Sequence, residues 1–143
     1  MNQGSVICIG EALVDRLGPL GGDPQFDKPS EDCLGGAPAN VACGLARLGS
    51  KTAFIGCLGK DSIGDSFREL MINRGINTSA LQLDNHRPTR VVLVRRDSNG
   101  ERSFEGFEGD KGLGFADQAI SLEKMIRDWP LVAEKAQWLV AGT

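Results

Sequence analysis

Short apolar runs alternate with helical patterns along this chain, and this alternation limits the possible fold more than any other feature. Three apolar runs stand out, residues 5–10 (SVICIG), 52–59 (TAFIGCLG) and 137–143 (QWLVAGT). Such runs are typical of strands that are buried on both faces of a parallel sheet. A helical pattern over 38–48 lies between the first two runs, and another over 61–75 follows the second run. The sequence therefore predicts an α/β fold with a parallel core sheet.

A second kind of β-structure is expected outside that sheet. Residues 89–107 (TRVVLVRRDSNGERSFEGF) contain two extended runs on either side of Asn99-Gly100, a dipeptide that favours a tight hairpin turn. Because a hairpin is antiparallel, it interrupts the strand–helix series and should form a separate small element. Residues 17–34 are rich in glycine and proline, and we expect mostly loop there, with one exposed strand near 26–34.

Apolar spacing also predicts which helix faces are buried. In the helix over 38–48, Val41, Leu45 and Leu48 recur at helical spacing, so we expect them to face the sheet. A further helix is expected over 116–129. Its predicted apolar face consists of Ala119, Leu122, Ile126 and Trp129.

The composition argues against several classes of function. The chain has 143 residues and a net charge of −3, whereas a nucleic-acid partner usually requires a basic face. The N-terminus has no basic segment and no apolar run is long enough to span a bilayer, so we expect neither a secretory signal nor a membrane partner. A single histidine argues against a His-rich zinc site. The four cysteines form no C-x-x-C pair, which favours reduced thiols and a cytoplasmic location.

Small and polar residues follow the predicted strands, where open parallel sheets bind their ligands. Asp15 follows the first strand, and residues 35–49 (GGAPANVACGLARLG) place Gly35 and Gly36 before a helix with Asn40 in its first turn. Glycine backbone can lie directly against a ligand, a carboxylate accepts hydrogen bonds, and an amide both donates and accepts them. The combination suits a neutral polyol such as a sugar. Spacing alone also fits, and on its own favours, a surface-turn aspartate, a plain glycine loop and a solvated asparagine.

Common nucleotide and hydrolase motifs are missing from the sequence. The Walker pattern G-x-x-x-x-G-K-[ST] fails around Gly59-Lys60, because Phe54 replaces its first glycine and Asp61 replaces its hydroxyl residue. No G-x-G-x-x-G follows a predicted strand, and there is neither a G-x-S-x-G elbow nor an H-E-x-x-H pair. These absences weigh against an unrelated Rossmann-like nucleotide binder.

Together these residues resemble the ribokinase-like, or PfkB, family of carbohydrate kinases. The family's first signature is matched in register by Gly35, Gly36, Ala37, Pro38, Asn40, Ala42, Gly49 and Gly59. Residues 10–15 (GEALVD) look like the opening of fructokinase-type members, and residues 59–76 are similar to the family's next segment. The resemblance covers the whole chain. It implies a ribokinase-like three-layer sandwich with a parallel core sheet and a small β lid.

The resemblance also implies an activity and roles for the candidate residues. Members of this family transfer the γ-phosphoryl group of ATP, with Mg²⁺, to the hydroxyl of a sugar or a related molecule. Asp15 and Asn40 would bind sugar hydroxyls, and Gly35 and Gly36 would approach the sugar through their backbone. A small-molecule sugar is therefore the expected partner.

Residues 24–34 and 89–107 would form the lid, which excludes water when it closes and can pair two copies into a homodimer. Many fructokinases and ketodeoxygluconate kinases carry an aromatic-Arg stretch after the lid hairpin that contacts the sugar. Here the comparable stretch, residues 104–114 (FEGFEGDKGLG), has Glu108 and no arginine. Arg90 on the lid strand either substitutes for it as a sugar ligand or is simply solvated.

Other parts of the family's site have no counterpart in the sequence. The D-T-x-G-A-G-D-like stretch, which supplies the catalytic base and the anion hole, is absent, and so is the N-x-x-E segment associated with magnesium and phosphate. We therefore expect residues 1–143 to be the N-terminal part of one kinase domain. Such a part carries the sugar-binding half, no catalytic residue, and little of the ATP and Mg²⁺ site. The alternative is a natural short form that acts as a non-catalytic sugar-binding or regulatory module.

Overall fold

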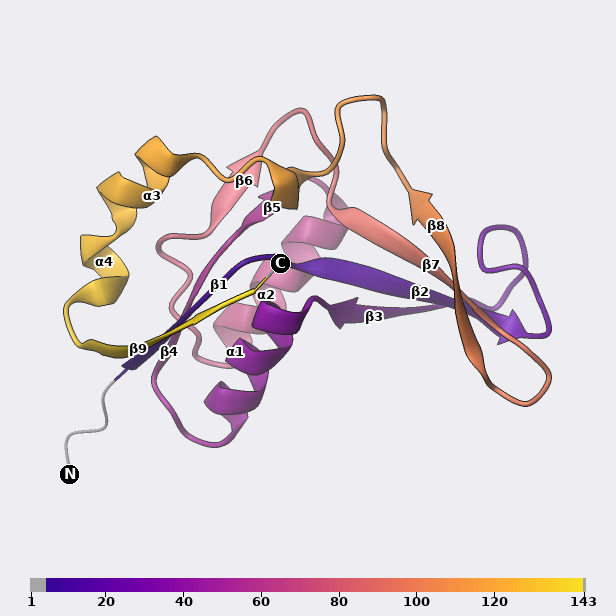
Figure 1. The fold of residues 1–143 in the computed structure, drawn as a ribbon, viewed down its shortest axis with the longest axis horizontal. Helices are drawn as coiled ribbons and strands as arrows, with labels where there is room; N and C mark the ends of the chain where they lie inside the picture. The colour runs from indigo at the N-terminus through magenta and orange to yellow at the C-terminus, as the bar shows by residue number, and fades with distance from the viewer. Residues whose placement is uncertain (1–4, 143) are drawn as a thin grey trace.

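A computed structural model describes residues 5–142, and its core is a parallel three-stranded sheet (Figure 1). The strands are β1 (Ser5–Ile9), β4 (Thr52–Ile55) and β9 (Ala136–Ala141), in the order β4-β1-β9. Both pairings are parallel, which confirms the predicted α/β class. Over the residues described, no helix has the length and apolar character needed to cross a membrane.

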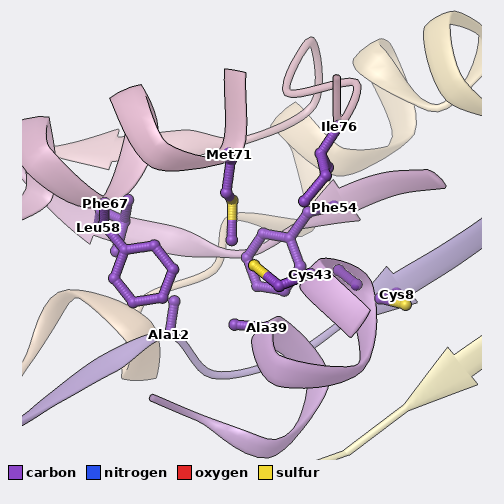
Figure 2. Packing of buried hydrophobic residues seen from close by; sticks show 10 residues of the cluster. Cys8, Ala12, Ala39, Cys43, Phe54, Leu58, Phe67, Met71 and Ile76 are labelled. Atoms are coloured by element: carbon purple, nitrogen blue, oxygen red, sulfur yellow. The ribbon is translucent and has the colours of Figure 1, made fainter. Parts of the chain in front are cut away.

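Helices α1 (Ala37–Arg47) and α2 (Ser62–Asn73) cover one face of this sheet. Phe67 and Met71 of α2 point toward Phe54 of β4 and are buried with it (Figure 2). Burial of side chains of this size stabilises the fold by roughly 1.5–3 kcal/mol each. This cluster therefore fixes both helices against the sheet.

Helices α3 (Leu122–Asp128) and α4 (Pro130–Ala133) lie on the opposite face. Val132 of α4 packs there against Ile7 of β1 and Ile55 of β4. The body is thus a three-layer sandwich. Residues 6–9 of β1 and 53–55 of β4 are all apolar, because helices cover both faces of these strands.

A separate four-stranded sheet projects from the body (Figure 1) and corresponds to the predicted lid. Strands β7 (Arg90–Arg96) and β8 (Arg102–Glu108) form the predicted hairpin, with Gly100 at φ +85° in its turn. Strands β2 (Leu13–Leu20) and β3 (Glu31–Gly35) complete the order β3-β2-β7-β8. The hairpin therefore lies outside the core sheet, as predicted, and we call this sheet the lid sheet.

The predicted strand over 52–59 is in fact two strands in different sheets. After β4 the chain turns at Gly56, and β5 (Cys57–Gly59) pairs in parallel with β6 (Gln82–Asp84). A side chain at Gly56 would lie 2.8 Å from the carbonyl oxygen of Gly10. The close approach of the chain after β1 explains why a glycine divides the run.

The prediction of loop over most of residues 17–34 is wrong at its start, because β2 continues to Leu20. Leu17 is buried against Val94 of β7, so this part of the strand has an apolar face of its own. Pro19 hid the strand, since proline cannot donate to a sheet ladder. The pairing with β7 shifts register between Leu17 and Leu20, and this irregularity accommodates the proline.

The predicted buried face of α1 is wrong at two of its three residues, because only Leu45 packs against the core cluster. Val41 and Leu48 are 40% and 84% exposed, whereas Ala39, Ala42 and Cys43 are buried. Small side chains allow the helix axis to lie close to the sheet at interior packing density. The face of α1 that is buried is therefore the one with small side chains, because only that face lets the helix pack close to the sheet.

The helix predicted over 116–129 is wrong as a single element. The chain forms a 3₁₀ turn, η1 (Ala116–Gln118), and after a break the short helices α3 and α4. Pro130 begins α4 at a position where its missing N–H has no helical partner to lose. Three residues of the predicted apolar face are exposed, namely Leu122, Ile126 and Trp129.

Candidate sugar-binding site

The candidate site lies where the lid sheet joins α1. Gly35 ends β3 and pairs with Leu13 of β2, and Gly36 is the N-cap of α1 with φ +94°. A side chain at Gly36 would lie 2.7 Å from the carbonyl oxygen of Glu11. Both the positive φ and this close approach require glycine at the position before the helix.

Asp15 lies within β2 rather than directly after β1, so the predicted position at the end of the first strand is wrong. The chain has already entered the lid sheet when it reaches this residue. Asp15 is on the same face of β2 as Leu13, whose partner is Gly35. A methyl group at Gly35 would lie 3.0 Å from Asp15 Oδ2. The structure therefore brings the predicted carboxylate directly against the predicted glycine.

The environment of Asp15 makes its carboxyl group harder to ionise than it is in water. Burial raises the pKa of the Asp15 carboxyl, attraction by Arg102 opposes this, and repulsion from Glu11 adds to it. A partly desolvated carboxylate has few waters to lose when a hydroxyl donates to it. Such hydrogen bonds are strong, because the acceptor is charged.

Asn40 lies in the first turn of α1, where its backbone N–H donates to the Gly36 carbonyl oxygen at 2.8 Å. Its side chain is exposed, whereas Ala39 and Cys43 of the same helix are buried. Asn40 is therefore one helical turn from Gly36 and is accessible to a ligand.

Arg90, the first residue of β7, is held by an ion pair and by two aromatic rings. Its Nη2 donates to Asp117 Oδ1 at 3.0 Å, and its side chain is only 18% exposed. The guanidinium carbon lies 5.5 Å from the ring centroid of Phe107 and 5.4 Å from that of Phe115. The side chain of Arg90 is therefore held by protein groups and is not simply solvated, and its role as a sugar ligand stays a prediction.

Arg90 and Asp117 line an open cavity of about 330 Å³ at the junction of lid and body. Gly10, Glu11 and Gly142 also line it. Because Gly10 follows β1 and Gly142 follows β9, the cavity lies at the carboxyl ends of two core strands, where the fold class predicts a ligand. Other candidate residues lie outside this lining, namely Asp15, Gly35, Gly36 and Asn40.

Sequence reasoning missed Asp117, whose side chain is 1% exposed. Burial raises the pKa of Asp117, and attraction by Arg90 opposes this. Among residues 5–142, neither Asp117 Oδ2 nor Arg90 Nε has a hydrogen-bond partner. The only signal in the sequence was an acidic residue directly after Phe115 and Ala116, and the expected helix over 116–129 concealed it.

A second polar cluster joins the lid sheet to the body. Asp61 caps α2 by accepting from Gly64 N at 2.8 Å, and it also accepts from Thr89 N at 2.8 Å and Thr89 Oγ1 at 2.9 Å. Thr89 Oγ1 accepts in turn from Gly59 N at 3.0 Å. Since Thr89 directly precedes β7, these bonds fix the point at which the lid hairpin leaves the body.

A three-layer body, a projecting β lid and a polar cavity between them define a ribokinase-like α/β fold. The chain belongs to the pfkB family of carbohydrate kinases, whose family model matches residues 3–134. The resemblance seen in the sequence is thereby confirmed.

Three relatives show how this chain compares with known members. It is 41% identical over 99 residues to a fructokinase from Escherichia coli, covering 69% of this chain and 30% of the relative. It is 38% identical over 125 residues to a fructokinase from Vibrio alginolyticus, covering 87% of this chain and 37% of the relative. A solved structure of a fructokinase with bound ATP from Xylella fastidiosa superposes with a TM-score of 0.77 at 30% identity. The match covers 97% of this chain and 39% of the solved chain. The chain thus spans between 30% and 39% of the length of these relatives.

Proposed function

We propose that this chain is the sugar-binding part of an ATP-dependent carbohydrate kinase of the fructokinase type. The observation that carries the proposal is the contact of the Asp15 carboxylate with Gly35, where the lid sheet meets α1. The carboxylate can accept hydrogen bonds from two sugar hydroxyls, and the glycine backbone beside it can lie directly against a ligand. Asn40, one turn along α1, adds a group that both donates and accepts.

The lid sheet supports a role in phosphoryl transfer. A sugar bound at Asp15 lies against one face of this sheet, so closure of the sheet over the sugar would exclude water from the reacting hydroxyl. Exclusion of water favours transfer to the sugar over hydrolysis of ATP. The role of this chain in the reaction is therefore to bind and orient the sugar and to keep it dry.

We propose further that ATP and Mg²⁺ bind mainly to segments outside this chain. Over residues 5–142 there is no group of three or more His, Cys, Asp or Glu side chains that could hold a metal ion. The sequence also has no Walker loop. The limited share of the relatives that the chain spans supports the same division. With free thiols at all four cysteines, we place the protein in the cytoplasm.

Binding and activity test the proposal separately. Ligand-observed NMR titration of this chain with D-fructose is expected to show saturable binding. A chimera, in which this chain replaces the matching segment of the Escherichia coli fructokinase, is expected to phosphorylate fructose with ATP. If hexoses, pentoses and nucleosides neither bind nor react, the proposal is wrong. Binding without activity in a folded chimera would favour a non-catalytic sugar-binding module.

Replacement of Asp15 by asparagine is expected to weaken fructose binding by roughly 10- to 100-fold, because a hydrogen bond to a charged acceptor contributes about 1.5–3 kcal/mol. Thermal stability without sugar should rise slightly at pH 7. The reason is that the raised pKa of Asp15 makes its ionised form unfavourable in the folded state. NMR titration and thermal unfolding measure the two effects.

The same raised pKa predicts how binding depends on pH. Because the ionised carboxylate accepts from the sugar, affinity should fall as the pH drops through the raised pKa, beginning above the ordinary value of 3.8. The Asp15→Asn variant should lose this dependence. Glu31→Gln is the matched control, since Glu31 is an exposed carboxylate on the same face of the lid sheet. Equal losses in the two variants would contradict the role of Asp15.

We also propose that the lid sheet pairs two copies into a homodimer. Phe104 on this sheet is 79% exposed, on the same face as Phe107, which is 59% exposed, and exposed apolar residues gathered on one face mark a candidate protein interface. Trp138 on the sheet-edge strand β9 is 70% exposed and offers a competing surface. Sedimentation velocity is expected to show a dimer that Phe104→Lys dissociates and Trp138→Lys leaves intact. The reverse result would move the contact to β9.

A further inference from the structure

A buried ion pair in the cavity carries an inference about which sugars the site accepts. Among residues 5–142, Arg90 is the only positively charged residue that lines the cavity, and Asp117 already holds its Nη2 at 3.0 Å. The rings of Phe107 and Phe115 both lie within 5.5 Å of the guanidinium carbon. Cation–π contact with two rings and an ion pair with a carboxylate keep the Arg90 head group from turning toward a ligand.

The residues that line the cavity carry a net negative charge. Glu11 and Asp117 carry carboxylates and Arg90 carries the guanidinium, which leaves a net charge of −1 among the lining residues. Asp15 lies outside the cavity lining but on the same face of the lid sheet as Arg90, which pairs with Leu13. It adds a further carboxylate beside the cavity, with Arg102 as the nearby opposing charge. An anionic ligand therefore meets repulsion with no available cation in the lining.

We propose that the Arg90–Asp117 pair makes this site selective for neutral sugars against sugar acids, an inference that rests on the sugar-kinase function proposed above. A neutral sugar brings hydroxyls, which need no counter-ion and can both donate and accept. A sugar acid brings a carboxylate, which loses its hydration water on binding. The Arg90 guanidinium in the lining does not compensate for this loss, because it is already paired with Asp117. Asp117 acts through Arg90 and is a positioning residue.

The incomplete pairing of these two groups supports a role beyond stability. Asp117 Oδ2 and Arg90 Nε are buried, and neither has a hydrogen-bond partner among residues 5–142. Leaving a buried donor and a buried acceptor unsatisfied costs stability, and apolar residues could fill the same space without that cost. We therefore assign this charged pair a role in selecting the ligand rather than in stabilising the fold.

The test compares two ligands that differ in one group. 2-Keto-D-gluconate is D-fructose with its C1 hydroxymethyl group oxidised to a carboxylate. The unmodified chain is expected to bind fructose more tightly than the acid in NMR titrations. In Asp117→Asn, which frees Arg90 and removes one negative charge, affinity for the acid should rise by roughly tenfold while fructose affinity changes by less than about threefold. A merely structural role would weaken both ligands together.

Two further variants separate the freed guanidinium from the general change in charge. Glu11→Gln removes the same charge but leaves Arg90 paired, so we expect a smaller gain for the acid, about two- to threefold. In the double variant Arg90→Gln, Asp117→Asn, the gain should disappear, because no guanidinium remains. Circular dichroism and thermal unfolding verify that each variant is folded.

The outcomes distinguish this inference from the function on which it rests. If the unmodified chain binds neither ligand, the sugar-binding function is wrong and the inference falls with it. If the chain binds fructose but Asp117→Asn gains nothing for the acid, the selectivity inference alone is overturned. Equal binding of both ligands to the unmodified chain would overturn it too. Should Asp117→Asn fail to fold, Glu11→Gln decides, and no gain for the acid in that variant rejects the inference.

Discussion

Replacement of Gly10 by alanine is expected to lower the free energy of unfolding by about 3 kcal/mol or more. Gly10 has φ +145°, and an added Cβ would overlap the carbonyl oxygen of Gly142 and lie 2.6 Å from Cγ of Pro38. Relief of this overlap requires movement of the end of β9 or the start of α1. Backbone strain and overpacking therefore add to one another. Urea unfolding followed by circular dichroism measures the loss.

Gly44→Ala is the matched control for this variant. Gly44 lies inside α1, and an added Cβ there would meet no atom within 4 Å. Alanine is the better helix former, so this substitution is expected to stabilise the chain by up to about 1 kcal/mol. Similar losses in the two variants would show that the strands and α1 do not meet at Gly10 as described.

Replacement of Asp61 by alanine is expected to cost about 3 kcal/mol of unfolding free energy. The loss of the α2 cap contributes roughly 0.5–2 kcal/mol, and the unsatisfied donors of buried Thr89 contribute roughly 1–3 kcal/mol. Because Thr89 precedes the lid hairpin, the backbone amide at Thr89 should also exchange its hydrogen faster. Urea unfolding and hydrogen exchange measure the two effects.

Asp65→Ala controls for the loss of an acidic residue near the start of the same helix. Asp65 lies in the first turn of α2 but is exposed, so only a weak interaction with the helix dipole is lost, about 0.3–1 kcal/mol. If Asp61→Ala unfolds α2 without changing exchange at Thr89, the proposed link between lid and body is absent.

Asp61 shows which contacts of a residue a local sequence pattern can predict and which it cannot. An aspartate directly before an apolar helical stripe predicts an N-cap, and the structure has that cap. The two hydrogen bonds from Thr89 come from a residue 28 positions along the chain. No pattern within a few residues indicates such a bond, because it depends on how the lid hairpin returns to the body.

The candidate site also contains some features that the sequence predicted and others that it did not. The glycine pair before α1 was readable as a backbone requirement, and the structure identifies the atoms behind it, the Glu11 carbonyl oxygen and the Asp15 carboxylate. The position of Asp15 in the lid sheet was not readable, because a proline and glycines disguised the end of β2. Asp117 was not readable either, since its importance comes from burial against Arg90.

The sequence by itself determined the alternation of core strands with helices, the lid hairpin, the N-cap of α2 and the family. These depend on periodicity, turn residues and motifs, which are properties of neighbouring residues. The tertiary structure decided which helix faces are buried, as Val41 and Leu48 show by their exposure, and which charged groups meet in the cavity. Those outcomes depend on the distance between layers and on contacts between segments far apart in the chain, and the order of residues along one segment does not specify them.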